Sequence, residues 1–298
     1  MKKTLLVLFI LSINLFCQTG GKTGLSFLEL GFGARNTALA DLGVITGKGA
    51  SAQIYNPALL DADNSPQIVF NHQTLLFDVS NQMIGCNFAL WNIPFAAAVQ
   101  TTSINDIEVR LTPGDPISKF NAHYFMGSIS TGYRIFGGFS AGITMKYIYE
   151  ELFTDNSNGI AFDFGLSYKN LFNGFNIGAS YRHLGSMNNL RNEASPLPEN
   201  FRLGTSYNFS ADNIYSDFTI ACGYLKYNSS NDNHFQAAGE IVIKHFLSVR
   251  GGYITGFDSK SLTAGAGICW GRFNFDYSFI PYKYDLGNSH TVSVSYDF

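Results

Sequence analysis

The stretch FSAGITMKYIY, residues 139–149, alternates between two kinds of side chain. Every second residue is apolar: Phe139, Ala141, Ile143, Met145, Tyr147 and Tyr149. The residues between the first five of these are small or polar: Ser140, Gly142, Thr144 and Lys146. Because successive side chains of a strand point to opposite faces, this period predicts a β-strand with one apolar face and one small, polar face.

The same two-residue period recurs along most of the chain from about residue 67. Clear repeats lie at 162–168, 175–181, 201–209, 262–270, 273–279 and 290–298. Weaker ones lie at 67–77, 82–90, 93–103, 122–133, 216–227, 234–244 and 246–255. Together with 139–149 they make fourteen segments. Each has about the length that a tilted membrane-spanning strand needs.

The joins between these segments alternate between short and long, as they do in barrels whose strands run up and down through a bilayer. The short joins are Trp91-Asn92, Ile135-Phe136, His245-Phe246 and Trp270-Gly271. The longer joins are 105–120, 151–158, 184–200, 228–233, 256–260 and 281–289. Both tryptophans fall at short joins, where an aromatic girdle at one membrane interface is expected.

A soluble β-sandwich also alternates, so the polar face has to decide between the two folds. The outward face of a sandwich carries many Lys, Glu and Arg residues, whereas only 14 % of this chain is charged, against about 25 % in soluble domains. The polar face holds isolated charges among Gly, Ser, Thr and Asn: Lys146, Asp163, Arg182, Arg202, Glu240 and Arg250. The sequence therefore predicts an all-β fold, a 14-stranded antiparallel transmembrane β-barrel with a polar lumen.

Two further regions precede the predicted barrel, which covers 67–298. Lys2 and Lys3 come before the apolar run 5–16, a pattern typical of a signal peptide, and we expect residues 1–19 to be that leader. Residues 20–66 have no sustained two-residue period. They predict a short, partly helical plug inside the lumen, with helices near 35–42 and 49–60.

The last predicted strand, HTVSVSYDF at 290–298, must pair with the first one if the barrel is closed. Tyr296 and Phe298 are expected on its lipid side. An aromatic end on an alternating strand also resembles the signal that the barrel-assembly machinery of the outer membrane reads. The prediction is therefore a protein of the outer membrane, surrounded by its lipid.

Several function classes find no support in the sequence. A formal net charge of −3 gives no electrostatic argument for a nucleic acid partner. After the leader, Cys86, Cys222 and Cys269 have neither metal-ligand nor disulfide spacing. The scattered histidines lie in no catalytic motif. We therefore expect no enzyme activity, no metal site and no cofactor.

The plug segment carries a resemblance to a known family. FLELGFGARNTALAD at 27–41 and GASAQIYNPALL at 49–60 resemble the amino-terminal signature of the PorV/PorQ family, which is related to the FadL-type channels. GITMKYIYEEL at 142–152, GIAFDFGLSYKN at 159–170 and PLPENFRLGTSY at 196–207 follow in the family's order. The resemblance implies a fourteen-stranded barrel with an amino-terminal hatch.

Two short elements of this hatch are the candidate plug or ligand residues that the resemblance implies. Gly33, Ala34 and Arg35 match the family's GAR element, and Asn56, Pro57 and Ala58 match its Asn-Pro-Ala element. Because a proline ends a helix and an asparagine can satisfy freed backbone groups, the second element favours a structural role. Arg35 is expected either to neutralise a lumen carboxylate, such as Asp163 or Glu240, or to be solvated.

The resemblance implies a docking subunit in type IX-like protein secretion or cell-surface attachment. Its partners would be a secretion translocon, attachment-complex proteins or exported cargo. The alternative is a FadL-like channel for long-chain fatty acids or other hydrophobic small molecules. A channel should have an apolar pocket beneath its outer loops, whereas a docking subunit should have a filled lumen and an apolar outer rim. The small, polar lumen face favours docking.

Overall fold

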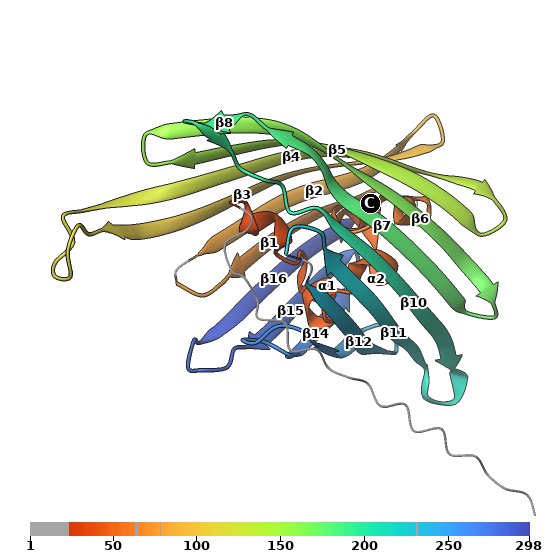
Figure 1. Cartoon of the computed structure of the whole chain (residues 1–298). Coiled ribbons are helices and arrows are strands. Elements are labelled where there is room, and N and C mark those ends of the chain that lie inside the picture. The colour runs from red at the N-terminus through yellow and green to blue at the C-terminus, as the bar shows by residue number, and fades with distance from the viewer. Residues whose placement is uncertain (1–23, 63–64, 78, 231) are drawn as a thin grey trace, which may run out of the picture.

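The computed structural model describes residues 24–62, 65–77, 79–230 and 232–298 (Figure 1). In this part of the chain, fourteen strands form one closed antiparallel barrel, which confirms the predicted fold. They are β1 (Gln67–Thr74), β2 (Ser80–Leu90), β3 (Ile93–Val109), β4 (Ser118–Phe136), β5 (Phe139–Leu152), β6 (Asp155–Phe172), β7 (Phe175–Met187), β10 (Asn200–Ala211), β11 (Ser216–Tyr227), β12 (Asn233–Ile243), β13 (Leu247–Ile254), β14 (Leu262–Trp270), β15 (Phe273–Pro281) and β16 (Asn288–Asp297). A separate ribbon joins β8 (Asn189–Leu190) to β9 (Glu193–Ala194).

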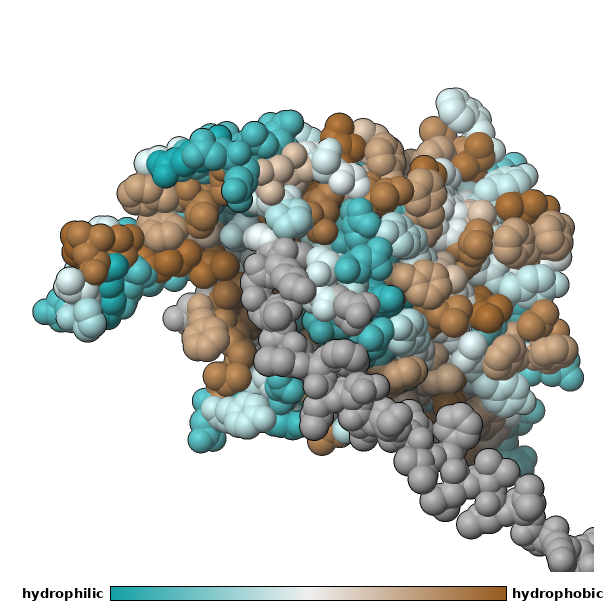
Figure 2. Space-filling view, viewed as in Figure 1, coloured by the Kyte–Doolittle hydropathy of each residue, from teal (hydrophilic) through white to brown (hydrophobic). Residues whose placement is uncertain are grey.

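The predicted alternation separates the lumen from the outside of the barrel. Along β5, Ser140, Thr144 and Lys146 are buried, whereas Ile143 and Tyr147 are exposed. Figure 2 shows many apolar side chains over the outside of the wall. Since a closed sheet leaves no unpaired strand edge in lipid, this arrangement suits a membrane-spanning barrel.

The seam of the barrel lies between its first and last strands. β1 pairs with β16 from Gln67 opposite Asp297 to Thr74 opposite His290. At the end of β16, the Tyr296 ring packs against Phe273 and Phe298, with centroids 4.9 and 5.0 Å apart. Both aromatic residues thus lie at the seam, and their recognition by the assembly machinery stays a prediction.

The two ends of the barrel differ. At the short-turn end, strands are joined by connections such as 91–92, 137–138 and 271–272, and β1 begins and β16 ends there. At the opposite, long-loop end the connections include 110–117, 188–199, 255–261 and 282–287.

Two predicted loops at the long-loop end are strand over half of their length or more. β3 and β4 pair as far as Val109 opposite Ser118, and β5 and β6 pair as far as Leu152 opposite Asp155. The loop predictions 105–120 and 151–158 were therefore too long. The tip of the β3–β4 hairpin pairs charged side chains, with Lys119 Nζ 3.3 Å from Asp106 Oδ1, so its strands lack an apolar lipid-facing period.

Five short helical segments lie inside the barrel, and Figure 1 shows them in red and orange within the wall. They are η1 (Ser26–Glu29), α1 (Ala34–Ala38), α2 (Gly43–Thr46), η2 (Gly49–Ile54) and η3 (Pro57–Ala62). We call residues 24–62 the hatch. The helix predicted at 35–42 ends at Ala38 because Ala40 and Asp41 adopt positive φ, and the one predicted at 49–60 is two 3-10 segments divided before Pro57.

No helix in the described residues is long and apolar enough to cross a membrane. The predicted signal peptide, residues 1–19, lies outside the described part of the chain.

Candidate functional site

The Asn-Pro-Ala element attaches the hatch to the wall. Asn56 is fully buried, and its Nδ2 donates to the carbonyl oxygens of Val44, at 2.9 Å, and Leu166, at 3.1 Å. Its Oδ1 accepts the Ala58 backbone N–H at 3.1 Å. Since Leu166 belongs to β6, the Asn56 side chain joins two hatch segments to one strand.

Three glycines of the wall allow this close approach. A Cβ atom at Gly142 would lie 2.5 Å from the Pro57 carbonyl carbon, and one at Gly165 would lie 2.8 Å from Pro57 Cδ. A Cβ atom at Gly132 would overlap the Pro57 carbonyl oxygen. Glycine is therefore required at these three positions, where the strands lie against the Asn-Pro-Ala element without room for a side chain. The sequence shows these residues only as part of a small-residue face, because what they contact lies far away in the chain.

The GAR element forms the second attachment. Gly33 has φ = 78°, a left-handed conformation that favours glycine, and it precedes α1. The Ala34 backbone N–H donates to Ser293 Oγ of β16 at 2.7 Å. Of the two carboxylates proposed as partners, Arg35 contacts Glu240 of β12, with Nε–Oε1 at 2.9 Å and Nη2–Oε2 at 2.5 Å. This is the bidentate geometry that makes arginine–carboxylate pairs strong.

The Arg35–Glu240 pair belongs to a chain of four charges. Arg250 Nε lies 2.6 Å from Glu240 Oε1, and Arg250 Nη1 lies 2.5 Å from Asp276 Oδ1. The chain joins α1 to β12, β13 and β15. Sequence reasoning identified three of the four as plug or lumen charges but missed Asp276, although it occupies an inward position of the alternating segment 273–279.

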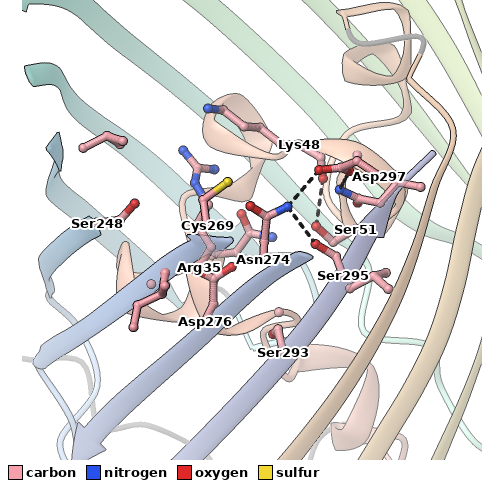
Figure 3. Close-up of a pocket in the computed structure, with 18 of the residues that line it drawn as sticks. Arg35, Lys48, Ser51, Ser248, Cys269, Asn274, Asp276, Ser293, Ser295 and Asp297 are labelled. Atoms are coloured by element: carbon pink, nitrogen blue, oxygen red, sulfur yellow. Dashed lines mark hydrogen bonds between the residues drawn. The ribbon is translucent and has the colours of Figure 1, made fainter. Parts of the chain in front are cut away.

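Two cavities flank this charge chain at the short-turn end. Their volumes are about 450 and 510 Å³, and Arg35, Lys48 and Gly49 line both. Figure 3 shows the first, with Arg35 and Asp276 on one side and Lys48 above. Asn274 lies in the centre of the view, and its Nδ2 donates to Asp297 Oδ2 at 2.8 Å and to Ser295 Oγ at 3.4 Å on the other side (Figure 3). The two cavities thus lie beneath the hatch, and their linings combine charged and amide side chains with apolar ones such as Val242 and Phe218.

An apolar compartment occupies the lumen toward the long-loop end. The wall contributes buried side chains from seven strands: Val69, Met83, Ala98, Met126, Ile148, Ala161 and Met187. The hatch fills the space between them with Leu25, Phe27, Leu28 and Phe32. The first part of the hatch therefore fills this apolar compartment of the lumen with its own apolar side chains.

A small pocket lies above the hatch at the long-loop end, with a free volume of about 40 Å³. Its apolar lining comes from the hatch, the strand ends and the loops: Leu30, Leu75, Ile254, Ile280 and Tyr282. Leu30 also packs against the apolar compartment. Leu30 thus contacts both the pocket and that compartment. We call this space the outer pocket.

Buried charges surround Tyr55 in the middle of the barrel. The Tyr55 ring has the guanidinium carbons of Arg202 and Arg182 at 5.3 and 5.8 Å from its centroid, within range of cation–π attraction. Its hydroxyl donates to Asp41 and also accepts the Phe32 N–H at 2.6 Å. Burial raises the pKa of the Tyr55 phenol well above its usual range, and the Asp41 carboxylate raises it further, so Tyr55 is neutral and a donor.

The described residues include no group of three or more His, Cys, Asp or Glu side chains arranged to hold a metal ion. The hatch residues that the sequence analysis named form two attachments to the wall, which we call anchors. Asn56, Pro57 and Ala58 attach the hatch to β4–β6, and Gly33, Ala34 and Arg35 attach it to β12 and β16.

No protein-family model matches this sequence, and no curated protein matches it. Solved structures do match. The CymD monoaromatic hydrocarbon channel has a TM-score of 0.60 at 13 % identity, over 90 % of this chain and 98 % of its own. The Pseudomonas putida toluene transporter TodX has a TM-score of 0.61 at 12 % identity, over 89 % and 96 %. A Pseudomonas aeruginosa FadL homologue has 0.55 at 11 %, over 89 % and 98 %. These likenesses concern the fold: the chain shares the barrel architecture of these three proteins.

Proposed function

We propose that this protein lies in the outer membrane, with its long-loop end outside, and admits a hydrophobic small molecule. The observation that supports this most is the outer pocket, an apolar space beneath the outer loops whose lining residue Leu30 also packs against the apolar compartment. The fold's likeness to hydrocarbon channels agrees with it. This reverses the order of the two functions that the sequence favoured.

The path for such a molecule would lead from the outer pocket into the apolar compartment and then to the two cavities at the short-turn end. In the structure, Leu25, Phe27 and Leu28 occupy the compartment. Transport therefore requires the segment before Gly33 to move. The two anchors can stay in place, because both lie at or after Gly33, whose left-handed φ makes it a suitable hinge.

A disulfide can test this movement. A Cβ atom at Gly24 would lie 3.3 Å from Ser195 Cβ, close to the separation in natural disulfides. We expect the double variant Gly24→Cys, Ser195→Cys to lose uptake of a hydrophobic probe such as toluene into proteoliposomes when oxidised, and to regain it on reduction. The single variants control for the added thiols and for the native Cys86, Cys222 and Cys269. Full uptake by protein shown to be crosslinked would contradict a moving hatch.

A docking subunit of the PorV/PorQ type is the second candidate. The hatch fills much of the lumen, and large apolar side chains are exposed at the tips of the tallest hairpins: Leu111, at 83 %, Ile117 and Phe153. Both features are those expected of a docking subunit. Affinity purification from gently solubilised outer membranes separates the candidates. Recovery of a translocon barrel or exported cargo, with no uptake in proteoliposomes, would favour docking.

A further inference from the structure

Among the described residues, the outer pocket contains one cation that forms no direct ion pair. Lys260, in the loop 255–261, lines the pocket, and its Nζ lies 4.5 Å from the centroid of the Phe257 ring. Within the described part of the chain, Nζ forms neither an ion pair nor a hydrogen bond. His234 stacks on the same ring, with centroids 3.8 Å apart, and holds Phe257 in place. The ammonium is thus fixed in an apolar pocket without an anionic partner.

The carboxylate nearest to this pocket is already engaged. Asp41 also lines the pocket, but its Oδ2 lies 3.0 Å from Arg202 Nη1 and its Oδ1 accepts the Tyr55 hydroxyl. Burial lowers the pKa of Lys260, which Asp41 and Glu29 raise only in part and Arg202 lowers again. The pocket is therefore short of negative charge.

Further cations with free donors lie beneath the pocket. Arg202 and Arg182 are each only 1 % exposed. Arg202 Nη2 and Arg182 Nε and Nη1 have no hydrogen-bond partner among the described residues. Beyond them, Lys146 Nζ lies 2.5 Å from Asp163 Oδ2, and Arg182 Nε lies 3.7 Å from the same atom. Buried guanidinium groups normally use their N–H donors, so these free donors mark places for acceptor atoms.

The positive charges outnumber the negative ones along this line. Lys260, Arg202, Arg182 and Lys146 follow one another from the outer pocket to the middle of the lumen, and the carboxylates that act on them are Glu29, Asp41 and Asp163. Among the described residues, four cations thus face three carboxylates, and one positive charge has no matching carboxylate. An anion that enters the pocket gains partners at each step, whereas a neutral hydrocarbon gains none.

We propose that the outer pocket binds a small apolar molecule carrying one carboxylate, with Lys260 as its first partner and the free donors of Arg202 and Arg182 as the next. This rests on the proposed function as a channel for hydrophobic molecules and narrows its substrate class. The apolar lining accepts the body of the ligand, and about 40 Å³ limits the part held in the closed state to a carboxylate and part of a small ring. An aromatic carboxylate has this chemistry.

Benzoate and benzyl alcohol provide the test, because they share a ring and differ in charge. We expect the full-length protein in detergent to bind benzoate more tightly than benzyl alcohol in calorimetric titrations. Lys260→Met should weaken benzoate binding about tenfold or more, the range for losing a hydrogen bond to a charged group, and should leave benzyl alcohol binding unchanged. Lys283→Met, an exposed lysine in the adjacent loop 282–287, is the matched control.

The outcomes separate this inference from the function on which it rests. Equal binding of both probes, with no effect of Lys260→Met, would overturn the carboxylate site. Uptake of toluene or benzyl alcohol into proteoliposomes would then still support a channel for neutral molecules. If neither probe binds and neither enters proteoliposomes, both proposals fail.

Discussion

Replacement of Gly165 by valine is expected to release the hatch from the barrel. A Cβ atom there would overlap Asn56 Oδ1 and lie 2.8 Å from Pro57 Cδ. The closed sheet cannot yield, because both edges of β6 are hydrogen-bonded to its neighbours. The Asn-Pro-Ala element must therefore move away, and Asn56 loses its bonds to Val44 and Leu166. We expect a barrel that still assembles and a hatch that is cleaved rapidly in limited proteolysis.

Gly239→Val provides the control for that experiment. A Cβ atom at Gly239 would meet only the Thr219 carbonyl oxygen, at 3.9 Å, so the space around it is open. Valine is favoured in strands, and this variant should match the parent protein in heat-modifiable gel mobility and in protease resistance. Equal resistance of the hatch in the Gly165→Val protein would show that the Asn-Pro-Ala element is not an anchor.

Replacement of Glu240 by alanine should have the second large effect. It removes the carboxylate shared by Arg35 and Arg250, and leaves Arg35 with the Thr46 carbonyl oxygen as its remaining hydrogen-bond partner among the described residues. Breaking a buried ion pair on one side costs about 3 kcal/mol or more. We expect a lower midpoint of urea unfolding in detergent. In planar bilayers the conductance should rise, because a hatch that Arg35 no longer holds to β12 blocks the lumen less completely.

An exposed ion pair is the matched comparison for Glu240→Ala. Glu108 pairs with Arg110 on the β3–β4 hairpin, where both side chains are in contact with solvent. Glu108→Ala should leave both the unfolding midpoint and the conductance unchanged, since exposed pairs contribute little to stability. If Glu240→Ala behaves in the same way, the chain of four charges does not hold the hatch.

The strands could be predicted because lipid imposes a strict period on the outer face of the wall. Ile143, Met145 and Tyr147 are exposed in the structure only because lipid is the solvent on that side. Where the β3–β4 hairpin rises above the other strands, that constraint ends. Glu108 and Lys119 then oppose each other across the hairpin, and the sequence reads as a loop.

Half of the candidate site could be predicted for a related reason. Arg35 and Glu240 carry isolated charges among small residues. Few carboxylates of the lumen were therefore candidates to pair with Arg35, and Glu240 was one of the two named. The outer pocket was not predictable. It depends on the turn at Ala40 and Asp41, which carries the Asp41 carboxylate to Arg202, 161 positions along the chain. It also depends on Lys260, which has no periodic pattern around it.

The unequal strand lengths give the outer end of the barrel a high side and a low side. β4 has 19 residues and β13 has 8, a difference of about 35 Å of strand at ~3.3 Å per residue. Figure 1 shows the β3–β4 hairpin reaching far beyond the strands around β14. The outer pocket lies on the low side, between Ile254, Lys260 and Tyr282. The pocket therefore lies where the wall is short, well below the tips of the tall hairpins.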